Sequence, residues 1–331
     1  MDVDSIKNNI ENNYDMKITE IEKVKNTYKI CSGSDEYCIK IIKYDFEHFI
    51  FILSAIEHLQ RRGFEIIPEI IENVRNEKYI KLDSNYGYLT KWIPSRTSNY
   101  NNPLELGEIS KKLGELHNCS LGFSINRGMK PRIGWYSWIN VFNTRCEEIL
   151  DFKKRISQKA YKSDFDNIYL EYVESEIERG QKAIKGLKEN NYLQIMDKEV
   201  KKRGFCHHDY AHHNILIDND RKINIIDFDY CILDSHIHDL GSLLIRVMKD
   251  GKWNCDLADL IIENYCITNS ISAEEMKLMK YFIMFPQSFW QIGLQYYWEQ
   301  QPWGEEFFLN KIQRYIEDIP YREEFLGTYF R

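Results

Sequence analysis

A short β-hairpin in the second half of the chain constrains the fold more than any other feature, because polar side chains stand at both of its ends. Residues 215–217 and 223–226 are apolar runs of strand length, and turn-forming residues lie between them. A hairpin brings the residues before its first strand close to the residue that ends its second strand. Asp209, Asn214 and Asp227 are therefore predicted to share one cleft.

These side chains suit phosphoryl transfer, in which a protein positions ATP, neutralises its charge with Mg²⁺ and orients an acceptor hydroxyl. Asp209 is the predicted catalytic base, which accepts the proton of that hydroxyl. The amide oxygen of Asn214 and the carboxylate of Asp227 are the predicted ligands of Mg²⁺, a hard ion that prefers oxygen. His207 is expected to brace the catalytic loop. Asp239 is expected to accept hydrogen bonds from the backbone of that loop.

The spacing resembles the kinase signature, in which an Asn follows His-x-Asp by five residues and a later strand ends in Asp-Phe. The resemblance is closer to the aminoglycoside phosphotransferases and choline kinases than to the protein kinases, because Ala211 stands where protein kinases have a Lys. Asp229 replaces the glycine that protein kinases have after Asp-Phe. The resemblance implies an α+β, two-lobed, protein-kinase-like fold. Its N-lobe would hold a small antiparallel sheet and one main helix, and its larger C-lobe would be mostly helical.

Longer segments resemble the CotS family of spore coat proteins, over roughly residues 20 to 320. They are HLQRRGF with the following IIPEII, LTKWIPSR, LGELHNCSLGF and CHHDYAHHNILI. This resemblance implies the phosphotransferase fold and an association with the coat of bacterial endospores. It does not by itself imply that a given member transfers phosphate, because fold and activity are separate properties.

The length of 331 residues, with 43% hydrophobic residues, is near the limit at which one core divides. We expect residues 1–93 to form a nucleotide-binding N-lobe. Residues 94–331 are expected to form the helical C-lobe, with the catalytic loop and the acceptor site. The formal charge of -7, with basic residues interspersed among acids, disfavours nucleic acid as a partner. The expected partners are a small-molecule acceptor or spore coat proteins.

The eight cysteines form no C-x-x-C pair, which favours free thiols in a reducing compartment. Residues 1–13 are polar and acidic, unlike a signal peptide, and the apolar run at residues 49–53 is too short to cross a bilayer. We therefore expect no membrane partner. The expected location is the cytoplasm or the spore coat, which is assembled from the mother-cell cytoplasm.

Nucleotide-binding residues are predicted in the N-lobe. Lys40 lies in a strand-like run whose apolar neighbours would aim its ammonium at the phosphates of ATP. A hinge just before Pro94 would offer its backbone to adenine. The hinge consists of Leu89, Thr90, Lys91, Trp92 and Ile93.

Two features that usually accompany such a lysine are not evident. The helix predicted at residues 46–62 offers Glu47 and Glu57 as ionic partners, but family analogy points nearer to Ile52. No glycine-rich phosphate loop is present, and Lys25 to Tyr28 stand where it would be sought.

The rest of the chain is predicted to be mainly helical, at about 104–118, 168–187, 239–249, 256–267, 272–284, 286–299 and 305–317. Residues 282–303 are dense in aromatic rings. We expect most of these rings to pack in a core and a minority to contact the acceptor.

Two alternatives to an active kinase remain open. A kinase-like structural or binding protein of the coat is favoured by the missing loop and glutamate, and is opposed by the retained Lys40, Asp209, Asn214 and Asp227. A metal-dependent hydrolase is suggested by clustered Asp and His residues, and is opposed by the adjacency of two of those histidines in a loop. The histidines are His207, His208, His212, His213, His236 and His238.

Overall fold

The computed structural model describes residues 3–330, and its contacts divide the chain into two compact units. The first unit holds the chain up to Asn99 together with residues 118–132 and 207–232. The second unit holds residues 100–117 and 133–206 and the chain from Leu233 onward. The hairpin predicted from the sequence thus belongs to the same unit as the N-terminal sheet. The predicted lobe boundary after residue 93 stays a prediction.

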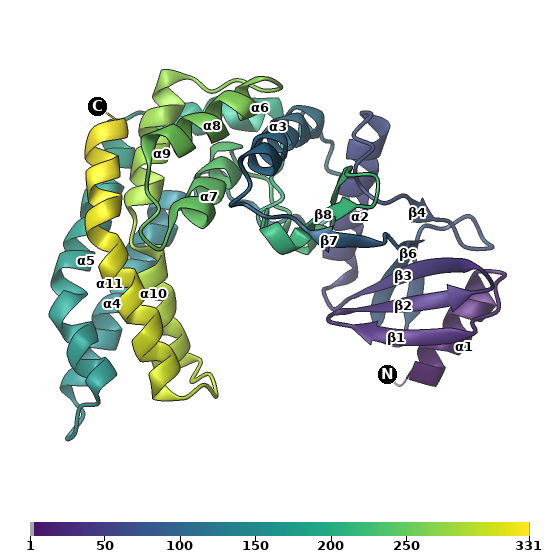
Figure 1. The fold of residues 1–331 in the computed structure, drawn as a ribbon, viewed down its shortest axis with the longest axis horizontal. Helices are drawn as coiled ribbons and strands as arrows, with labels where there is room; N and C mark the ends of the chain where they lie inside the picture. Colours follow the sequence, from purple (N-terminus) through teal and green to yellow (C-terminus); the bar gives the residue numbers. More distant parts are fainter. Residues whose placement is uncertain (1–2, 331) are drawn as a thin grey trace. The chain divides into compact units, whose positions relative to one another are not determined.

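The first unit contains an antiparallel sheet in the order β1-β2-β3-β6-β4, with β5 also paired to β6. The purple strands β1, β2 and β3 lie side by side in Figure 1. One helix, α1, packs against the sheet through Ile6 and Ile10, beside the buried Ile30, Ile39 and Leu89. The bounds are α1 (Val3–Asn13), β1 (Glu20–Val24), β2 (Thr27–Ser32), β3 (Asp35–Ile42), β4 (Ile70–Ile71), β5 (Ile80–Leu82) and β6 (Asn85–Lys91).

Helix α2 (Phe46–Arg61) follows β3, as predicted. Its apolar residues recur every three or four positions, and Phe49, Ile52 and Ile56 are buried. The chain leaves the helix at Gly63, whose φ of +81° is a left-handed conformation that glycine adopts without steric cost.

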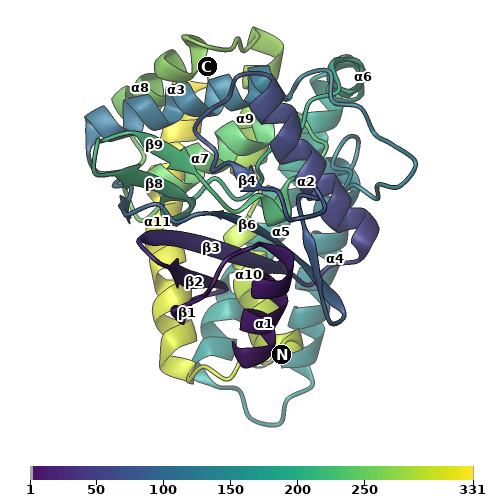
Figure 2. The same cartoon turned by 90° about the vertical axis from the view of Figure 1, so that its right-hand side faces the viewer.

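The predicted hairpin belongs to a second sheet of the first unit, in the order β7-β8-β9. Figure 1 labels β7 and β8, and Figure 2 labels β8 and β9. The strands are β7 (Ser95–Thr97), β8 (Ile215–Asp218) and β9 (Ile223–Ile225). Asp218 closes the turn, because its Oδ1 accepts hydrogen bonds from the amides of Asp220 (3.0 Å) and Lys222 (2.8 Å). The 3₁₀ turns η1 (His212–Asn214) and η2 (Phe228–Tyr230) flank the hairpin. The hairpin prediction was therefore correct, whereas β7 was not predicted.

The second unit is helical. Its longest helices, α5 and α11, pack together and enclose an aromatic core that includes Tyr169, Phe289 and Tyr297. Among the rings of residues 282–303, Phe285, Phe289 and Tyr297 are buried, and Trp290 and Tyr296 are partly buried against this core. Trp298 and Trp303 are each 42% exposed, so the expectation of mostly internal rings is met in part. The bounds are α3 (Pro103–Ser120), α4 (Trp138–Ser157), α5 (Asp164–Glu189), α6 (Tyr192–Lys202), α7 (Ile237–Met248), α8 (Cys255–Cys266), α9 (Ala273–Met284), α10 (Gln287–Gly293), the π-helix η3 (Leu294–Trp298) and α11 (Glu305–Tyr329).

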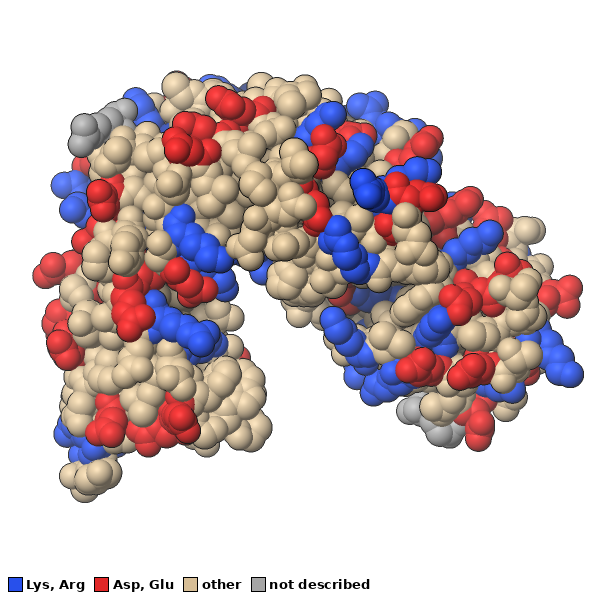
Figure 3. Space-filling model, in the orientation of Figure 1, with Lys and Arg blue, Asp and Glu red and all other residues tan. Residues whose placement is uncertain are grey.

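The predicted α+β class is confirmed, with an antiparallel sheet near the N-terminus and a larger helical part. Acidic and basic side chains are interspersed on the face drawn in Figure 3. None of the helices within residues 3–330 has the length and apolarity needed to cross a membrane.

Candidate functional site

A cavity of about 680 Å³ lies within the first unit. This volume is within the range of about 300–1,000 Å³ that is usual for small-molecule and cofactor sites. Its walls come from the β1–β2 turn, from β3 and β6, from residues 92–97, and from the hairpin with the residues that follow it. Lys40, Asn214 and Asp227 all line it, together with apolar side chains such as Ile70 and Leu216.

His207 braces the loop that carries Asp209. Its ring is fully buried, and Nε2 bonds to the backbone carbonyl of Ile226 at 3.0 Å. The amide of Asp209 donates to Nδ1 of the same ring at 3.3 Å. One imidazole therefore connects the loop that carries Asp209 to the end of the hairpin.

Asn214 connects the loop to the cavity. Its side-chain Nδ2 donates to Oδ2 of Asp209 at 2.8 Å and to the backbone carbonyl of Asp209 at 2.9 Å. Its backbone carbonyl accepts from the amide of Ile226, next to Asp227, at 3.0 Å. Among residues 3–330, no group donates to Oδ1 of Asn214, which leaves this oxygen available to a cation. The structure thus brings Asp209, Asn214 and Asp227 together.

Asp227 lies in a left-handed conformation, with φ of +69° and ψ of 64°. Aspartate tolerates this region better than most residues do, and such conformations are common at functional sites. The conformation begins the η2 turn, so two carboxylates, those of Asp227 and Asp229, converge on Lys40. The ammonium of Lys40 lies 2.5 Å from Oδ1 of Asp227 and 2.9 Å from Oδ1 of Asp229.

Asp229 answers the question of the missing ionic partner of Lys40. On α2, Glu57 pairs with Lys78 at 3.3 Å instead, and Glu47 is exposed and forms no ion pair within residues 3–330. The sequence signal for Asp229 was its replacement of the glycine after Asp-Phe. The sequence pattern points to a glutamate on the following helix as the partner, whereas the actual partner follows the hairpin.

The charges at Lys40 are unbalanced, since one ammonium faces two carboxylates. Burial alone would lower the pKa of Lys40, but attraction to Asp229 and Asp227 outweighs burial, and the pKa is raised. Burial raises the pKa of Asp229 to about 6, and the neighbouring charge of Asp227 adds to this rise against the opposing effect of Lys40. The site therefore holds a proton in mildly acid solution and has a surplus negative charge above that pH.

The predicted hinge divides into two parts. Leu89 is fully buried in the core beside α1 and does not line the cavity, whereas Thr90, Lys91, Trp92 and Ile93 do. The amide of Trp92 donates to the carbonyl of Glu36 at 2.9 Å, so it is occupied by the sheet. The backbone amide of Ile93 has no acceptor within residues 3–330 and is available to donate a hydrogen bond to a ligand.

The β1–β2 connection, which stands in place of a glycine-rich loop, is a two-residue turn. Lys25 has φ of +52°, and Oγ1 of Thr27 donates to the carbonyl of Val24 at 3.0 Å. Val24 to Thr27 all line the cavity. The turn thus offers the cavity a lysine side chain where a glycine-rich loop would offer mainly backbone amides.

Asp239 lies in the second unit and is almost fully buried. Its Oδ2 bonds to Nε2 of His117 at 3.1 Å, and Nδ1 of His117 bonds to the hydroxyl of Tyr265 at 2.8 Å. Burial lowers the pKa of His117, against the opposing effect of Asp239. The support that Asp239 would give to the catalytic loop stays a prediction.

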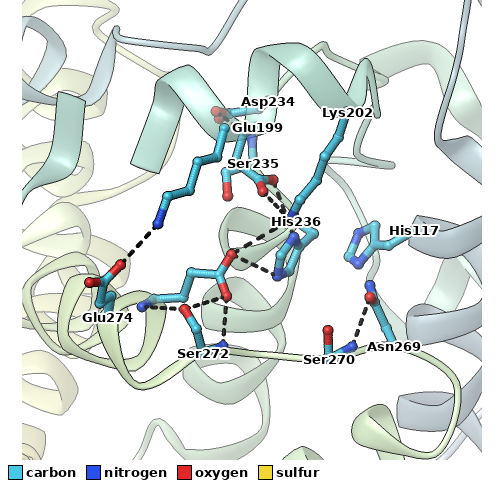
Figure 4. Close-up of polar contacts among 12 residues, drawn as sticks. His117, Glu199, Lys202, Asp234, Ser235, His236, Asn269, Ser270, Ser272 and Glu274 are labelled. Carbon is cyan, nitrogen blue, oxygen red and sulfur yellow. Dashed lines mark hydrogen bonds and ion pairs between the residues drawn. The ribbon is translucent and has the colours of Figure 1, made fainter. Parts of the chain in front are cut away.

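The other histidines of the suggested metal cluster in the second unit have separate partners. His238 bonds to Asp234 at 2.9 Å, whereas Nδ1 of His236 bonds to Glu199 at 3.2 Å (Figure 4). The ammonium of Lys202 also lies 2.6 Å from Glu199. Charged side chains of the protein therefore already compensate the carboxylate beside His236.

The family described as "Spore coat putative kinase YutH" matches residues 7–329. Spore coat protein S of Bacillus subtilis (strain 168) is 22% identical over 282 residues, which cover 85% of this chain and 80% of that protein. These findings confirm the resemblance to spore coat proteins.

Two solved phosphotransferases share the fold. The aminoglycoside phosphotransferase from Alicyclobacillus acidocaldarius subsp. acidocaldarius DSM 446 has a TM-score of 0.82 and 18% identity, over 96% of this chain and 92% of that one. The spectinomycin phosphotransferase in complex with ADP and spectinomycin has a TM-score of 0.64 and 16% identity, over 98% of this chain and 94% of that one.

Proposed function

Because the chain belongs to this family of spore coat kinase-like proteins, we propose that it is a phosphotransferase that moves the γ-phosphate of ATP to a hydroxyl of a small molecule. One observation carries the proposal. Asn214 bonds through Nδ2 to Asp209, while Asn214, Asp227 and Lys40 line one cavity. This arrangement joins a proton acceptor, oxygen ligands and a phosphate-binding cation.

The donors in the cavity fit Mg²⁺ with ATP. Oδ1 of Asn214 and the carboxylate of Asp227 are the hard oxygen ligands that Mg²⁺ prefers, and the surplus negative charge beside Lys40 favours a cation. When bound, the metal would neutralise charge on the phosphates. Adenine would lie among the apolar side chains of the cavity, with the free amide of Ile93 as a hydrogen-bond donor.

In the proposed reaction, Asp209 accepts the proton of the attacking hydroxyl. The amide of Asn214 holds one oxygen of this carboxylate, and the His207 ring fixes the backbone of the loop. Lys40 leaves its aspartate partners in part and binds the phosphates. Lys25, in the β1–β2 turn, supplies a second cation in place of the amides of a glycine-rich loop.

A nucleotide-binding coat protein without turnover is the second candidate. The two-residue β1–β2 turn favours it, because that turn has fewer backbone amides to hold the phosphates through the transition state. For either candidate we propose action in the cytoplasm or at the spore coat, where the acceptor or other coat proteins would be the partners.

Thermal unfolding with ATP and Mg²⁺ tests the nucleotide site, because a ligand that binds the folded state stabilises it. Wild type should gain melting temperature and Asp227→Ala should not. Asp220→Ala, an exposed aspartate in the hairpin turn, is the matched control and should behave as wild type. Equal, negligible shifts in all three proteins would contradict nucleotide binding.

Turnover distinguishes the two candidates. ATP consumption with a panel of amino sugars, amino alcohols and polyols should fall by about 10²–10⁴-fold in Asp209→Asn, while ATP binding persists. Binding without any acceptor-dependent consumption in wild type would favour the coat protein without turnover.

A further inference from the structure

Arg132 lies in the first unit and is held close to the start of α2. The amide of Lys130, two residues earlier, donates to the carbonyl of Glu47 at 3.0 Å. The carbonyl of Lys130 contacts Nδ1 of the buried His48 at 3.1 Å. These two contacts fix the backbone that leads into Arg132.

Two tyrosine rings contact the guanidinium of Arg132. Its central carbon lies 4.9 Å from the ring centre of Tyr44 and 5.1 Å from that of Tyr230. Tyr44 follows Lys40 by four residues, and Tyr230 follows Asp227 by three. The arginine therefore contacts the two segments that carry the predicted phosphate-binding lysine, Lys40, and the predicted metal ligand, Asp227.

The hydrogen-bonding edge of Arg132 is not used by the protein. Within residues 3–330 the side chain makes no hydrogen bond and no ion pair, and its guanidinium stacks on the two rings. An arginine stacked on aromatic faces keeps its five N–H donors at the rim of a planar fork, which matches the oxygens of a phosphate or carboxylate. The rings thus restrict the guanidinium and leave its donors available.

The charge of Arg132 also acts on Asp229 and on Tyr230. Burial raises the pKa of Asp229 to about 6, and Arg132 is one of the charges that oppose the rise. The pKa of Tyr230 is raised chiefly by Tyr44 and by burial, with a further contribution from Asp209. Arg132 and Asp209 therefore both act on Tyr230, which is 46% exposed.

We propose that Arg132, held by Tyr44 and Tyr230, is the receptor for a phosphate-type oxyanion. The proposal rests on the proposed function and extends it to the choice of acceptor. The oxyanion is either the phosphoryl group in transfer or an anionic group on the acceptor. Because the two rings already contact a cation, a cationic acceptor gains no aromatic site there, and a neutral or anionic acceptor is favoured.

Calorimetric titration of three variants tests this receptor. Arg132→Met removes the charge and keeps the length, and Arg132→Lys keeps the charge without the fork. Arg127→Met, an exposed arginine of the same segment, is the matched control. The ligands are ADP with Mg²⁺, the non-hydrolysable analogue AMP-PNP with Mg²⁺, and inorganic phosphate added to the protein alone or to its ADP complex.

If the oxyanion is the transferred group, Arg132→Met should weaken AMP-PNP about ten- to a hundred-fold and leave ADP unchanged. If it belongs to the acceptor, AMP-PNP should be unchanged and the loss should fall on inorganic phosphate. Arg132→Lys should be intermediate. Equal affinities of Arg132→Met and Arg127→Met for every ligand would overturn the proposal.

The phosphate titration of the nucleotide-free protein separates this inference from the proposed function. Wild type that binds phosphate through Arg132 but binds no nucleotide would contradict the proposed function and support the receptor. If wild type binds ADP with Mg²⁺ and Arg132→Met binds every ligand as tightly as wild type does, the proposed function is supported and the receptor is contradicted.

Discussion

The side-chain amide of Asn214 donates a hydrogen bond of 2.8 Å to Oδ2 of Asp209, so the predicted base and a predicted metal ligand are physically joined. Asn214→Asp would keep an oxygen for the metal but would set two carboxylates side by side, and like charges disfavour joint ionisation.

We expect Asn214→Asp to bind ADP with Mg²⁺ more weakly than wild type in acid solution and to recover as the pH rises. Asn214→Ala should bind more weakly at every pH, by roughly ten- to a hundred-fold. Titration calorimetry between about pH 5 and pH 8 measures the affinity of both variants for ADP with Mg²⁺, across a range wide enough to include a raised carboxyl pKa. Asn219→Asp, in the exposed hairpin turn, is the control and should follow wild type.

Asp229 should make metal-nucleotide binding depend on pH. Its pKa in the folded protein is raised from 3.8 to about 6, so the carboxyl group is protonated below about pH 6 and ionised above it. Affinity for ADP with Mg²⁺ should therefore increase as the pH rises through about 6, with release of a proton. Asp229→Asn should flatten this dependence, and a dependence that persists in the variant would contradict the assignment.

The same raised pKa has a consequence for stability. A carboxyl group whose folded pKa exceeds its unfolded value stabilises the fold fully below the unfolded pKa, and this contribution is lost as the pH rises through the folded pKa. Without ligand, the melting temperature of Asp229→Asn relative to wild type should therefore be higher above about pH 6 than it is below ~5. Asp220→Asn serves as the control.

Glu199 should stabilise the second unit in a pH-dependent way. Burial opposes its ionisation, but His236 and Lys202 outweigh burial and lower its pKa from 4.5 to about 2. The stabilisation is therefore complete above the unfolded value of 4.5 and is lost as the pH falls towards 2.

Glu199→Gln should reduce the free energy of unfolding at neutral pH by about 3 kcal/mol, because the buried carboxylate that His236 and Lys202 contact loses its charge. Glu274→Gln is the matched control (Glu274 is labelled in Figure 4). The ion pair between Glu274 and Lys198 is exposed and should contribute less than about 1 kcal/mol. Urea unfolding of both variants measures the difference. The cost of Glu199→Gln should shrink in acid, and an equal cost at all pH values would contradict the ion-pair explanation.

Two helical glycines should respond oppositely to alanine. A Cβ on Gly114, in α3, would lie 2.5 Å from the backbone carbonyl of Tyr265, whereas one on Gly327, in α11, would have nothing within 4 Å. Gly114→Ala should cost about 1–3 kcal/mol of stability through overpacking, and Gly327→Ala should add about 0.5–1 kcal/mol through helix propensity. Thermal and urea unfolding measure both, and a tolerated Gly114→Ala would show that α3 and α8 can separate without cost.

Local chemistry made much of the site predictable from the sequence. The hairpin requires only apolar runs and a turn, and its geometry brings Asp209 and Asn214 close to Asp227. Helix α2 has a strong apolar repeat and a terminal glycine. The strand that carries Lys40 was predictable because the neighbours of Lys40 are apolar, and the structure places Lys40 in β3 at the wall of the cavity.

The parts that were missed depend on contacts between distant segments. The pairing of Asp229 with Lys40 arises from the left-handed turn at Asp227, which periodicity does not reveal. Strand β7 has three exposed residues and exists through its pairing with β8. Leu89 was placed in the hinge, but the side-chain alternation of β6 directs it into the core beside α1. The sequence does not single out Arg132, because the two tyrosines that contact it, Tyr44 and Tyr230, are distant from it in the chain.

The pairing of Lys40 with Asp227 bears on the order in which ligands arrive. With the ammonium 2.5 Å from one oxygen of Asp227, the protein on its own offers free magnesium a carboxylate that is already half satisfied. In the proposed reaction, a bound triphosphate would draw the lysine away, and the carboxylate of Asp227 would then be available to hold the metal. Occupancy should consequently follow the concentration of the magnesium–nucleotide complex in the cell, and fluctuations in magnesium alone should pass unnoticed.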